Sequence, residues 1–539
     1  MSVIEALANC QFVALRYEGP HVECTGITAV VKQELRTFHE RGGVMIAPWS
    51  GRMTSARQAL QTGKVVDTGF SFPVETSVDR PVPVRVLANT TPNQAPLFYL
   101  AAEGFFEGVE SPYDTRCLIR DVLFFGLAVR QLIEGHVPAS CWIWGADWQT
   151  VPAAILLRPR YRTALTLHNT FDSFLGDSLW QYDAPQFTVF RRYTALETAL
   201  VHLDVVTTVN RGYAYGLRNE VFHTQVMARH LQFGVHRIVG IDNANFVDPT
   251  PEQLSLADTL QRNPAEGLQQ LERMQQEAIA ELPGDLAAKV RGKTLCVAMG
   301  RRSSQKLHDI VAEAVRFALQ RQPSLPVFVF FATTHSDSGS FARLERIQRL
   351  CEEFPEHAGW SDGRVPYYPQ LMKAGSYNIL CSLWEPHGGA FEATIVPIAR
   401  AVDGLATQIN PLNRHGLAGR IADLWHSETA LPSGLTFREE PSETYADDLR
   451  ELLEVSPAPP NTTARRLAQA LASSLIQAVE IRRDRPTDFA RMVLGAIRQQ
   501  LPRSWLINFG GMLSLIELAG VRRIGTLPRI GPDAALKSR

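Results

Sequence analysis

Short apolar runs rich in β-branched residues alternate along the chain with longer segments whose apolar residues recur at helical spacing. This alternation predicts βαβ units around a parallel sheet. In the first half, the predicted strands are Cys10–Tyr17, Gly43–Trp49, Pro83–Ala88, Pro96–Ala101, Cys141–Gly145, Thr163–His168, Asp204–Val209 and Arg237–Ile241. The clearest predicted helices between them are Ala29–His39, Ile119–Glu134 and Arg191–His202.

A second α/β series follows a break in this pattern. From Pro251 to Leu282 the chain is rich in Gln and Glu, with apolar residues at helical spacing, until Pro283-Gly284 interrupts the helix. We therefore predict a domain boundary there. Beyond it, the predicted strands are Thr294–Met299, Val327–Ala332, Tyr377–Leu383 and Ile395–Ala399, and the predicted helices are Lys306–Gln320, Ser340–Glu353 and Ala464–Arg483.

The sequence thus predicts an α/β fold of two Rossmann-like, doubly wound domains. The expected bounds are 1–285 and 286–495, with a C-terminal helical segment, 496–539, that crosses back to the first domain. In such folds ligands bind at the carboxyl ends of the strands, which we expect on either side of an interdomain cleft. Fold alone does not give function, so the residues at the strand ends carry the functional prediction.

Composition narrows the class of protein. The 54 Lys and Arg nearly cancel the 55 Asp and Glu, which argues against a nucleic-acid partner because phosphate backbones favour a basic excess. The longest strongly apolar runs, such as 327–332, are far shorter than the roughly 20 residues that span a bilayer, and the N-terminus lacks the pattern of a signal peptide. The seven cysteines are scattered and contain no Cys-x-x-Cys pair, which favours reduced thiols. We expect a cytoplasmic enzyme.

Two glycine-containing loops directly follow predicted strands of the second domain. In GRRSSQK (300–306), Arg301 and Lys306 lie at a strand-to-helix turn, where both can reach an anion at the helix N-terminus. In WEPHGG (384–389), two glycines allow backbone amides to approach a phosphate, and Glu385 can accept hydrogen bonds from sugar hydroxyls. Taken singly, each loop is also compatible with a solvated turn.

A histidine ends one strand of the first domain. His168 lies in LTLHNTFDSFLG (165–176), a segment that resembles the "IHN" segment of the bacterial glycogen and starch synthases, which are retaining glycosyltransferases of the GT-B fold. On its own, a histidine at a strand end is more often structural. Further segments resemble the family in the same order along the chain: FFEGVESPYD (105–114), GADWQT (145–150), LDVVTTVNRGYA (203–214), VGIDNANFVDP (239–249), RRSSQK (301–306), CSLWEPHGG (381–389) and IARAVDGLATQI (398–409).

The resemblance implies a role for four catalytic residues. Arg301 and Lys306 bind the diphosphate of a nucleotide-sugar donor, Glu385 contacts the transferred sugar, and His168 lies beside its anomeric carbon. Fixed cations suit this reaction because negative charge grows on the leaving diphosphate in the transition state. The family also implies that no metal or other cofactor is required, and the sequence contains no HExxH-type cluster.

Other residues would bind the donor. By resemblance, Asn243 faces the sugar, and the backbone at Gly388 and Gly389 holds the distal phosphate. Glu392 lies seven positions after Glu385, on nearly the same helix face, and is either a ribose contact or a solvated residue. Gly26 is the one glycine kept from the family's "KxGGL" loop, in which the acid Glu23 replaces the cation.

We therefore expect a retaining glucosyltransferase that uses ADP-glucose or UDP-glucose to extend an α-1,4-glucan. The acidic Glu23 leaves open a GT-B enzyme with a different donor or a non-glucan acceptor. A non-catalytic protein that binds glucan or nucleotide sugar is the third possibility. The sequence predicts neither the donor base nor the oligomeric state.

Overall fold

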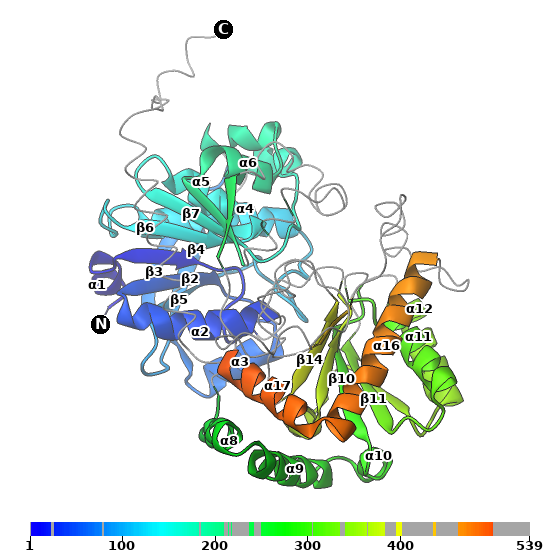
Figure 1. The fold of residues 1–539 in the computed structure, drawn as a ribbon. Helices are drawn as coiled ribbons and strands as arrows, with labels where there is room; N and C mark the ends of the chain where they lie inside the picture. The colour runs from blue at the N-terminus through cyan, green and yellow to red at the C-terminus, as the bar shows by residue number, and fades with distance from the viewer. Residues whose placement is uncertain are drawn as a thin grey trace. The chain divides into compact units, whose positions relative to one another are not determined.

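The computed structural model describes residues 2–22, 26–77, 80–182, 185–209, 214, 217, 237–241, 249–303, 306–334, 340–363, 365–382, 395–400, 435–437 and 462–499. By their contacts these residues form two units, each built around its own sheet (Figure 1). The first unit contains the described residues up to 209 together with 237–241, and the second unit contains residues 214 and 217 and those from 249 onward.

The first unit is built on a nine-stranded sheet of order β3-β4-β5-β2-β1-β6-β7-β8-β9. Strands β5, β2, β1, β6, β7, β8 and β9 run parallel, whereas β4 is antiparallel to both β5 and β3. The strands are β1 (Phe12–Leu15), β2 (Gly43–Pro48), β3 (Val65–Val74), β4 (Val82–Asn89), β5 (Leu97–Ala102), β6 (Trp142–Ala146), β7 (Arg162–Leu167), β8 (Val205–Thr208) and β9 (Ile238–Gly240). All eight predicted strands are present, and the edge strand β3 was not predicted.

The helices of this unit are α1 (Val3–Ala8), α2 (Gly26–Glu40), α3 (Thr54–Gln61), α4 (Leu118–Ile133), α5 (Val151–Leu157) and α6 (Ala195–His202), with short 3-10 turns at 148–150, 176–181 and 185–191. Helix α6 begins later than predicted because Thr194 caps it. The Thr194 hydroxyl accepts a hydrogen bond from the Glu197 amide, and the Glu197 carboxylate accepts one from the Thr194 amide. The cap fixes the helix start at Ala195.

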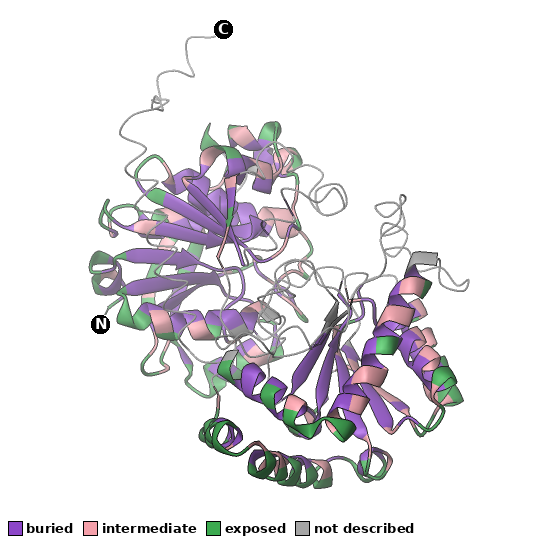
Figure 2. Cartoon of the chain, viewed as in Figure 1, coloured by how far each residue is buried: buried purple, intermediate pink, exposed green. Residues whose placement is uncertain are grey.

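Aromatic side chains fill the core between the first sheet and α2. The Phe12 ring lies 4.9 Å from that of Phe38, edge to face, and Trp144 packs against both. Trp144 and Trp148 are buried, as expected for core residues, and the Trp180 side chain lies outside the described residues. Figure 2 shows the central strands buried along most of their length. This packing holds the strand ends in fixed positions.

The second unit is built on a sheet of order β12-β11-β10-β13-β14-β15 whose paired strands are all parallel among the described residues. These strands are β10 (Thr294–Arg301), β11 (Val327–Thr334), β12 (Ala358–Asp362), β13 (Tyr377–Leu380), β14 (Val396–Arg400) and β15 (Leu435–Phe437). The helices are α8 (Pro251–Arg262), α9 (Pro264–Ala280), α10 (Gly284–Val290), α11 (His308–Arg321), α12 (Ser340–Glu353), α13 (Tyr368–Ala374), α16 (Thr462–Asp484) and α17 (Pro486–Gln499).

The boundary expected at Pro283-Gly284 lies inside the second unit. Helix α9 packs on α13 and α17, and the Gln275 side chain joins two other parts of the unit. Its amide donates to the Gly375 carbonyl at 3.0 Å, and its oxygen accepts from Arg482 at 2.8 Å. The proline and glycine therefore separate α9 from α10 within one unit. The segment expected to begin at 496 starts inside α17, and residues 500–539 lie outside the described part.

Two further properties bear on the sequence predictions. Among the described residues, no helix is both long and apolar enough to cross a membrane. The six cysteines in that part of the chain carry free thiols, and four of them are buried.

Candidate active site

Three neighbouring strands of the first sheet end in polar residues. Arg16, Tyr17 and Glu18 follow β1, Asp147 follows β6, and His168 follows β7. Because β1 pairs with β6 and β6 with β7, all parallel, their carboxyl ends lie side by side. These five residues, which we call the strand-end cluster, are distant in sequence and are brought together by the sheet.

His168 is held by its backbone and leaves a ring nitrogen available. Its amide donates to Asp147 Oδ1 at 2.8 Å, and its side chain is 8% exposed. Nε2 is buried and has no hydrogen-bond partner among the described residues. Burial, followed by the charge of Arg16, lowers the pKa of His168 to about 3. The imidazole is therefore neutral near pH 7.

Asp147 joins two strand ends. Its φ of +55° places it in the left-handed region, where the residue can turn back from β6 toward β7. Besides the His168 amide, it accepts a hydrogen bond from the Asn169 amide. Burial raises the pKa of Asp147 to about 7, against the lowering effect of these amides. Asp147 thus orients His168 through the backbone.

Arg16 is the buried cation of the strand-end cluster. Its guanidinium donates to both carboxylate oxygens of Glu34 on α2, each at 2.7 Å, and to the carbonyls of Leu15 and Trp144 at 2.8 and 3.1 Å. It also lies over the Trp144 ring, 5.0 Å from its centroid. A bidentate pair of this kind is the geometry in which a buried arginine is best satisfied. Arg16 therefore ties β1, β6 and α2 together.

Glu18 and Tyr17 complete the cluster. Glu18 is buried and accepts hydrogen bonds from the Tyr113 hydroxyl at 2.6 Å and from the Thr28 hydroxyl at 3.1 Å. Tyr17 stacks on Tyr113, and its own hydroxyl is buried with no hydrogen-bond partner among the described residues. Burial raises the pKa of Tyr17 well above its ordinary value, so that its hydroxyl keeps its proton.

Unpartnered polar atoms gather at this edge of the sheet. Besides Tyr17 and His168, the described chain leaves buried side-chain oxygens without a partner on Ser50 after β2, Gln149 after β6 and Thr170 after β7. These strands are consecutive in the sheet order. Buried polar groups are usually hydrogen-bonded, so such a concentration along one sheet edge is typical of a site that receives a polar ligand.

The second unit presents the loop between β10 and α11. Arg301 is the last residue of β10 and is exposed, and Lys306 is half-buried two residues before α11. The helix begins at His308, later than the predicted start at Lys306. Gly300, within β10, has a φ of +125°, a conformation that favours glycine. Both predicted cations therefore lie in the short connection between β10 and α11.

Arg302, between these cations, points into the unit. It is fully buried, and its Nη1 lies 2.6 Å from Asp362 Oδ1 at the end of β12 and 3.0 Å from Thr333 Oγ1 in β11. Its carbonyl accepts a hydrogen bond from the Ser340 hydroxyl at 2.7 Å. Arg302 therefore fastens the loop to two neighbouring strands and to α12, and leaves Arg301 at the surface.

The remaining predicted residues are not described. Glu385, Asn243, Gly388, Gly389 and Glu392 all lie outside the described residues, as does Glu23. Gly26 is the first residue of α2. Within the described residues, no group of three or more His, Cys, Asp or Glu side chains is placed to hold a metal ion.

Sequence reasoning missed Arg16, Glu18, Arg302 and Asp362. Each lies at the carboxyl end of a strand or within three residues after it, and this position was the available signal. A charged residue that interrupts an apolar run at such a point is either solvated or buried with a partner. The partners, Glu34 for Arg16 and Asp362 for Arg302, are 18 and 60 residues away along the chain.

Comparisons with known proteins show what this chain is similar to. Residues 19–232 match the family model of the starch synthase catalytic domain. The chain is 25% identical over 406 residues to a glycogen synthase of Ralstonia nicotianae, an alignment that covers 69% of this chain and 70% of that protein. It is 27% identical over 299 residues to a glycogen synthase of Bordetella petrii, covering 51% and 55% of the two chains.

The chain is thus similar to glycogen and starch synthases. The resemblance seen in the sequence is thereby confirmed, and the matched region contains both Asp147 and His168. In fold, the chain is similar to the catalytic domain of starch synthase IV from Arabidopsis thaliana, solved bound to ADP and acarbose, with a TM-score of 0.69 at 16% identity over 95% of this chain and 99% of that one.

A UDP-forming trehalose-phosphate synthase from Burkholderia xenovorans has a similar fold, with a TM-score of 0.50 at 11% identity and coverage of 95% and 99%. The two mainly parallel α/β sheets match a GT-B-like fold, which confirms the predicted fold class.

Proposed function

We propose that this protein is a retaining glucosyltransferase that moves glucose from ADP-glucose or UDP-glucose to the non-reducing end of an α-1,4-glucan. In the reaction, the bond between the sugar's anomeric carbon and the diphosphate oxygen breaks, and a bond to an acceptor hydroxyl oxygen forms. The acceptor proton leaves with the products, and the nucleoside diphosphate is released. The protein is expected to work in the cytoplasm and without a metal ion.

The observation that carries the proposal is the state of His168. A neutral, buried imidazole with an unpartnered Nε2 stands at the end of β7, inside the region that matches the starch synthase catalytic domain. A preorganised neutral group of this kind can hydrogen-bond to a sugar without adding a positive charge beside an anomeric carbon that itself becomes positive. Asp147 fixes its position through the backbone.

The β10–α11 loop supports the donor half of the proposal. Arg301 and Lys306 would neutralise the charge that develops on the leaving diphosphate, and Arg302 would hold their loop in place. The Arabidopsis homologue of similar fold was solved with ADP and acarbose, which favours a nucleotide and a saccharide as the two ligands here.

The same proposal assigns the residues outside the described part. Glu385 would contact the transferred sugar, Asn243 would face it, Gly388 and Gly389 would hold the distal phosphate, and Glu392 would reach the ribose. Gly26 would let the start of α2 approach the donor. The first unit would then bind the acceptor and the second the nucleotide sugar.

A donor panel tests the proposal. The full chain is incubated with ADP-glucose, UDP-glucose and other nucleotide sugars in the presence of glycogen, and release of nucleoside diphosphate is measured together with labelling of the polymer. We expect release and labelling with at least one glucose donor. Lys306→Ala should reduce the rate about a hundredfold or more. Lys373→Ala, an exposed lysine of α13, is the matched control and should leave the rate unchanged.

The other outcomes separate the alternatives. Release of nucleoside diphosphate without labelling of glycogen would indicate a different acceptor, which the acidic Glu23 favours. Labelling only from a donor other than a glucose nucleotide would indicate a different sugar. Absence of release with every donor, with binding of glucan retained, would show a non-catalytic binding protein and overturn the proposal.

A further inference from the structure

Two cysteines that are distant in sequence touch at the amino edge of the first sheet. Cys10 lies two residues before β1, and Cys141 directly precedes β6. Because β1 and β6 pair in parallel, the chain segments that lead into them are neighbours. The two Sγ atoms are 3.7 Å apart, a distance at which sulfur atoms are in contact. The pair lies before the two strands, whereas the strand-end cluster lies beyond their carboxyl ends.

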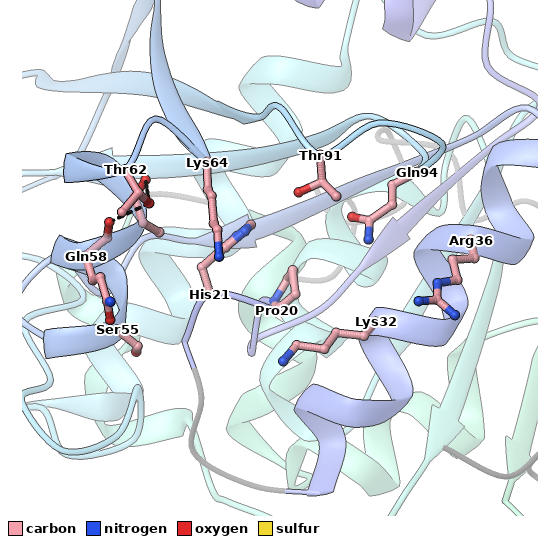
Figure 3. A pocket seen from close by; sticks show the side chains of 11 residues that line it. Pro20, His21, Lys32, Arg36, Ser55, Gln58, Thr62, Lys64, Thr91 and Gln94 are labelled. Atoms are coloured by element: carbon pink, nitrogen blue, oxygen red, sulfur yellow. Dashed lines mark hydrogen bonds between the residues drawn. The ribbon is translucent and has the colours of Figure 1, made fainter. Parts of the chain in front are cut away.

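The surroundings of the pair favour a reaction between the two sulfur atoms. The Cys10 thiol donates to the Leu7 carbonyl at 3.2 Å, the Cys141 thiol donates to the Cys10 carbonyl at 2.7 Å, and the two cysteines are 6% and 1% exposed. Within the described chain, no third His, Cys, Asp or Glu joins them in a group that could hold a metal ion. Neither cysteine is among the residues that line the cavity of this unit shown in Figure 3, whose volume is about 380 Å³. The thiols therefore face each other and not the space of that cavity.

A small movement is enough to join the two sulfur atoms. A disulfide bond is about 2.05 Å long, so the Sγ atoms have to approach by roughly 1.7 Å. Both cysteines lie in connections, Cys10 two residues after α1 and Cys141 at the end of a turn in which its amide donates to the Pro138 carbonyl at 2.9 Å. The ladder between β1 and β6 begins only at Phe12 and Trp142. The cysteines can therefore shift without breaking the pairing of the strands.

We propose that Cys10 and Cys141 are an oxidative modification site that closes reversibly to a disulfide when the protein meets hydrogen peroxide. The thiolate of one cysteine attacks a peroxide oxygen and becomes a sulfenic acid, and the hydroxide released takes up the proton that this thiol had lost. The sulfur of the other cysteine then attacks the sulfenic sulfur, so that the S–S bond forms, the S–O bond breaks and water leaves. In total, two thiols give up two electrons and two protons, and one peroxide is reduced to two water molecules. A dithiol reductant reverses the modification by thiol–disulfide exchange.

The disulfide would stabilise the first unit without touching its candidate site. It would link residues 131 positions apart in the chain, and closing so long a loop removes conformational freedom from the unfolded state. The oxidised protein should therefore resist unfolding more strongly than the reduced protein. The assignment depends on the contact between the two thiols and does not require the proposed transferase activity.

Peptide mapping of the full chain by mass spectrometry without reduction tests this site. The folded protein is treated with a small excess of hydrogen peroxide, the remaining thiols are blocked by alkylation, and the protein is then digested. We expect one linked pair of peptides, containing Cys10 and Cys141, whose mass is that of the two reduced peptides less two hydrogen atoms. Dithiothreitol should separate them. The midpoint of urea unfolding should rise on oxidation and return to its first value on reduction.

Single substitutions separate this pair from the other thiols. Cys10→Ser and Cys141→Ser should each abolish both the linked peptides and the rise in the urea midpoint, and either variant suffices if the other does not fold. Cys117→Ser is the matched control, because Cys117 is a more exposed thiol of the same unit, and both effects should persist in it. Three results would overturn the proposal: oxygen added to Cys10 or Cys141 without a link between them, a link from either one to another cysteine, or no reaction of the pair at peroxide concentrations that oxidise Cys117. A linked protein whose urea midpoint is unchanged would exclude the stabilising effect.

Discussion

Each unit of this protein uses a buried arginine to fasten its strand ends, and the two arginines differ in their partners. Arg16 pairs with Glu34, and the two side chains are 1% and 4% exposed. Arg302 pairs with Asp362, where the arginine is fully buried but the aspartate side chain is 50% exposed. The first pair is therefore sealed inside the first unit, whereas the second pair reaches from the interior to solvent.

This difference in burial matches the kind of side chain that each region offers to a ligand. The strand-end cluster offers neutral, buried groups such as the His168 imidazole, and these need a rigid frame that excludes water. The β10–α11 loop offers cations at the surface, and a frame with one solvated end is enough to hold it. We therefore expect substitutions of Arg16 to cause the larger loss in the free energy of unfolding. Substitutions of Arg302 should act mainly by misplacing Arg301 and Lys306.

The largest effect is expected from breaking the sealed pair. Arg16→Met leaves the Glu34 carboxylate buried without its partner and should lower the free energy of unfolding by about 3 to 5 kcal/mol. Urea unfolding followed by circular dichroism measures it. The double variant Arg16→Met/Glu34→Leu removes both charges and should recover most of the loss. A double variant no more stable than Arg16→Met would contradict the assigned role of the pair.

The next effect separates activity from stability within the same cluster. His168→Gln should slow release of nucleoside diphosphate about a hundredfold, because a preorganised hydrogen bond to the transferred sugar is lost. The free energy of unfolding should change by less than about 1 kcal/mol, because Nε2 is one of the unpartnered buried atoms and the change removes no side-chain hydrogen bond from it. An unchanged rate would remove His168 from the site.

A smaller effect is expected at the partly solvated pair. Arg302→Met should raise the KM for the donor about tenfold through misplacement of Arg301 and Lys306, with a smaller change in kcat. Arg302→Lys keeps one donor toward Asp362 and Thr333 and should restore part of the affinity. Steady-state kinetics with varied donor concentration measure both constants. An equal fall of kcat in both variants with unchanged KM would exclude this positioning role.

Much of this fold could be predicted from the sequence because its strands are buried on both faces. Apolar runs such as those that form β10 and β11 need no pairing information to be recognised. The edge strand β3 was missed because its exposed and buried residues alternate and glycine and proline interrupt it. The Pro-Gly stop at 283–284 lies within the second unit, because such a stop marks the end of a helix and contains no information on what α9 packs against.

Only those residues of the candidate site that lie in a local sequence motif could be predicted. His168, Arg301 and Lys306 each lie in a segment that resembles the family, and the segment can be read without its surroundings. Arg16 and Arg302 act through Glu34, Asp362 and Thr333, which the chain brings near only on folding.

The smallest effect is a pH dependence confined to the strand-end cluster. The pKa of Asp147 is raised to about 7 from an ordinary value of 3.8, so between about pH 4 and 7 the folded protein keeps a proton that the unfolded chain has lost. The stability of the parent protein therefore loses this contribution as pH rises through that window.

Asp147→Asn keeps the oxygen that accepts from the His168 amide and cannot ionise. The free energy of unfolding of the variant minus that of the parent should accordingly grow by at least about 1 kcal/mol from pH 4 to 7 and then level off. The buried His168 is present in both proteins and its opposite pH dependence cancels in this difference. Urea unfolding at a series of pH values measures the trend. A difference that stays flat or shrinks as pH rises would show that Asp147 is ionised in the folded protein. Water would then reach this edge of the sheet more than its burial implies.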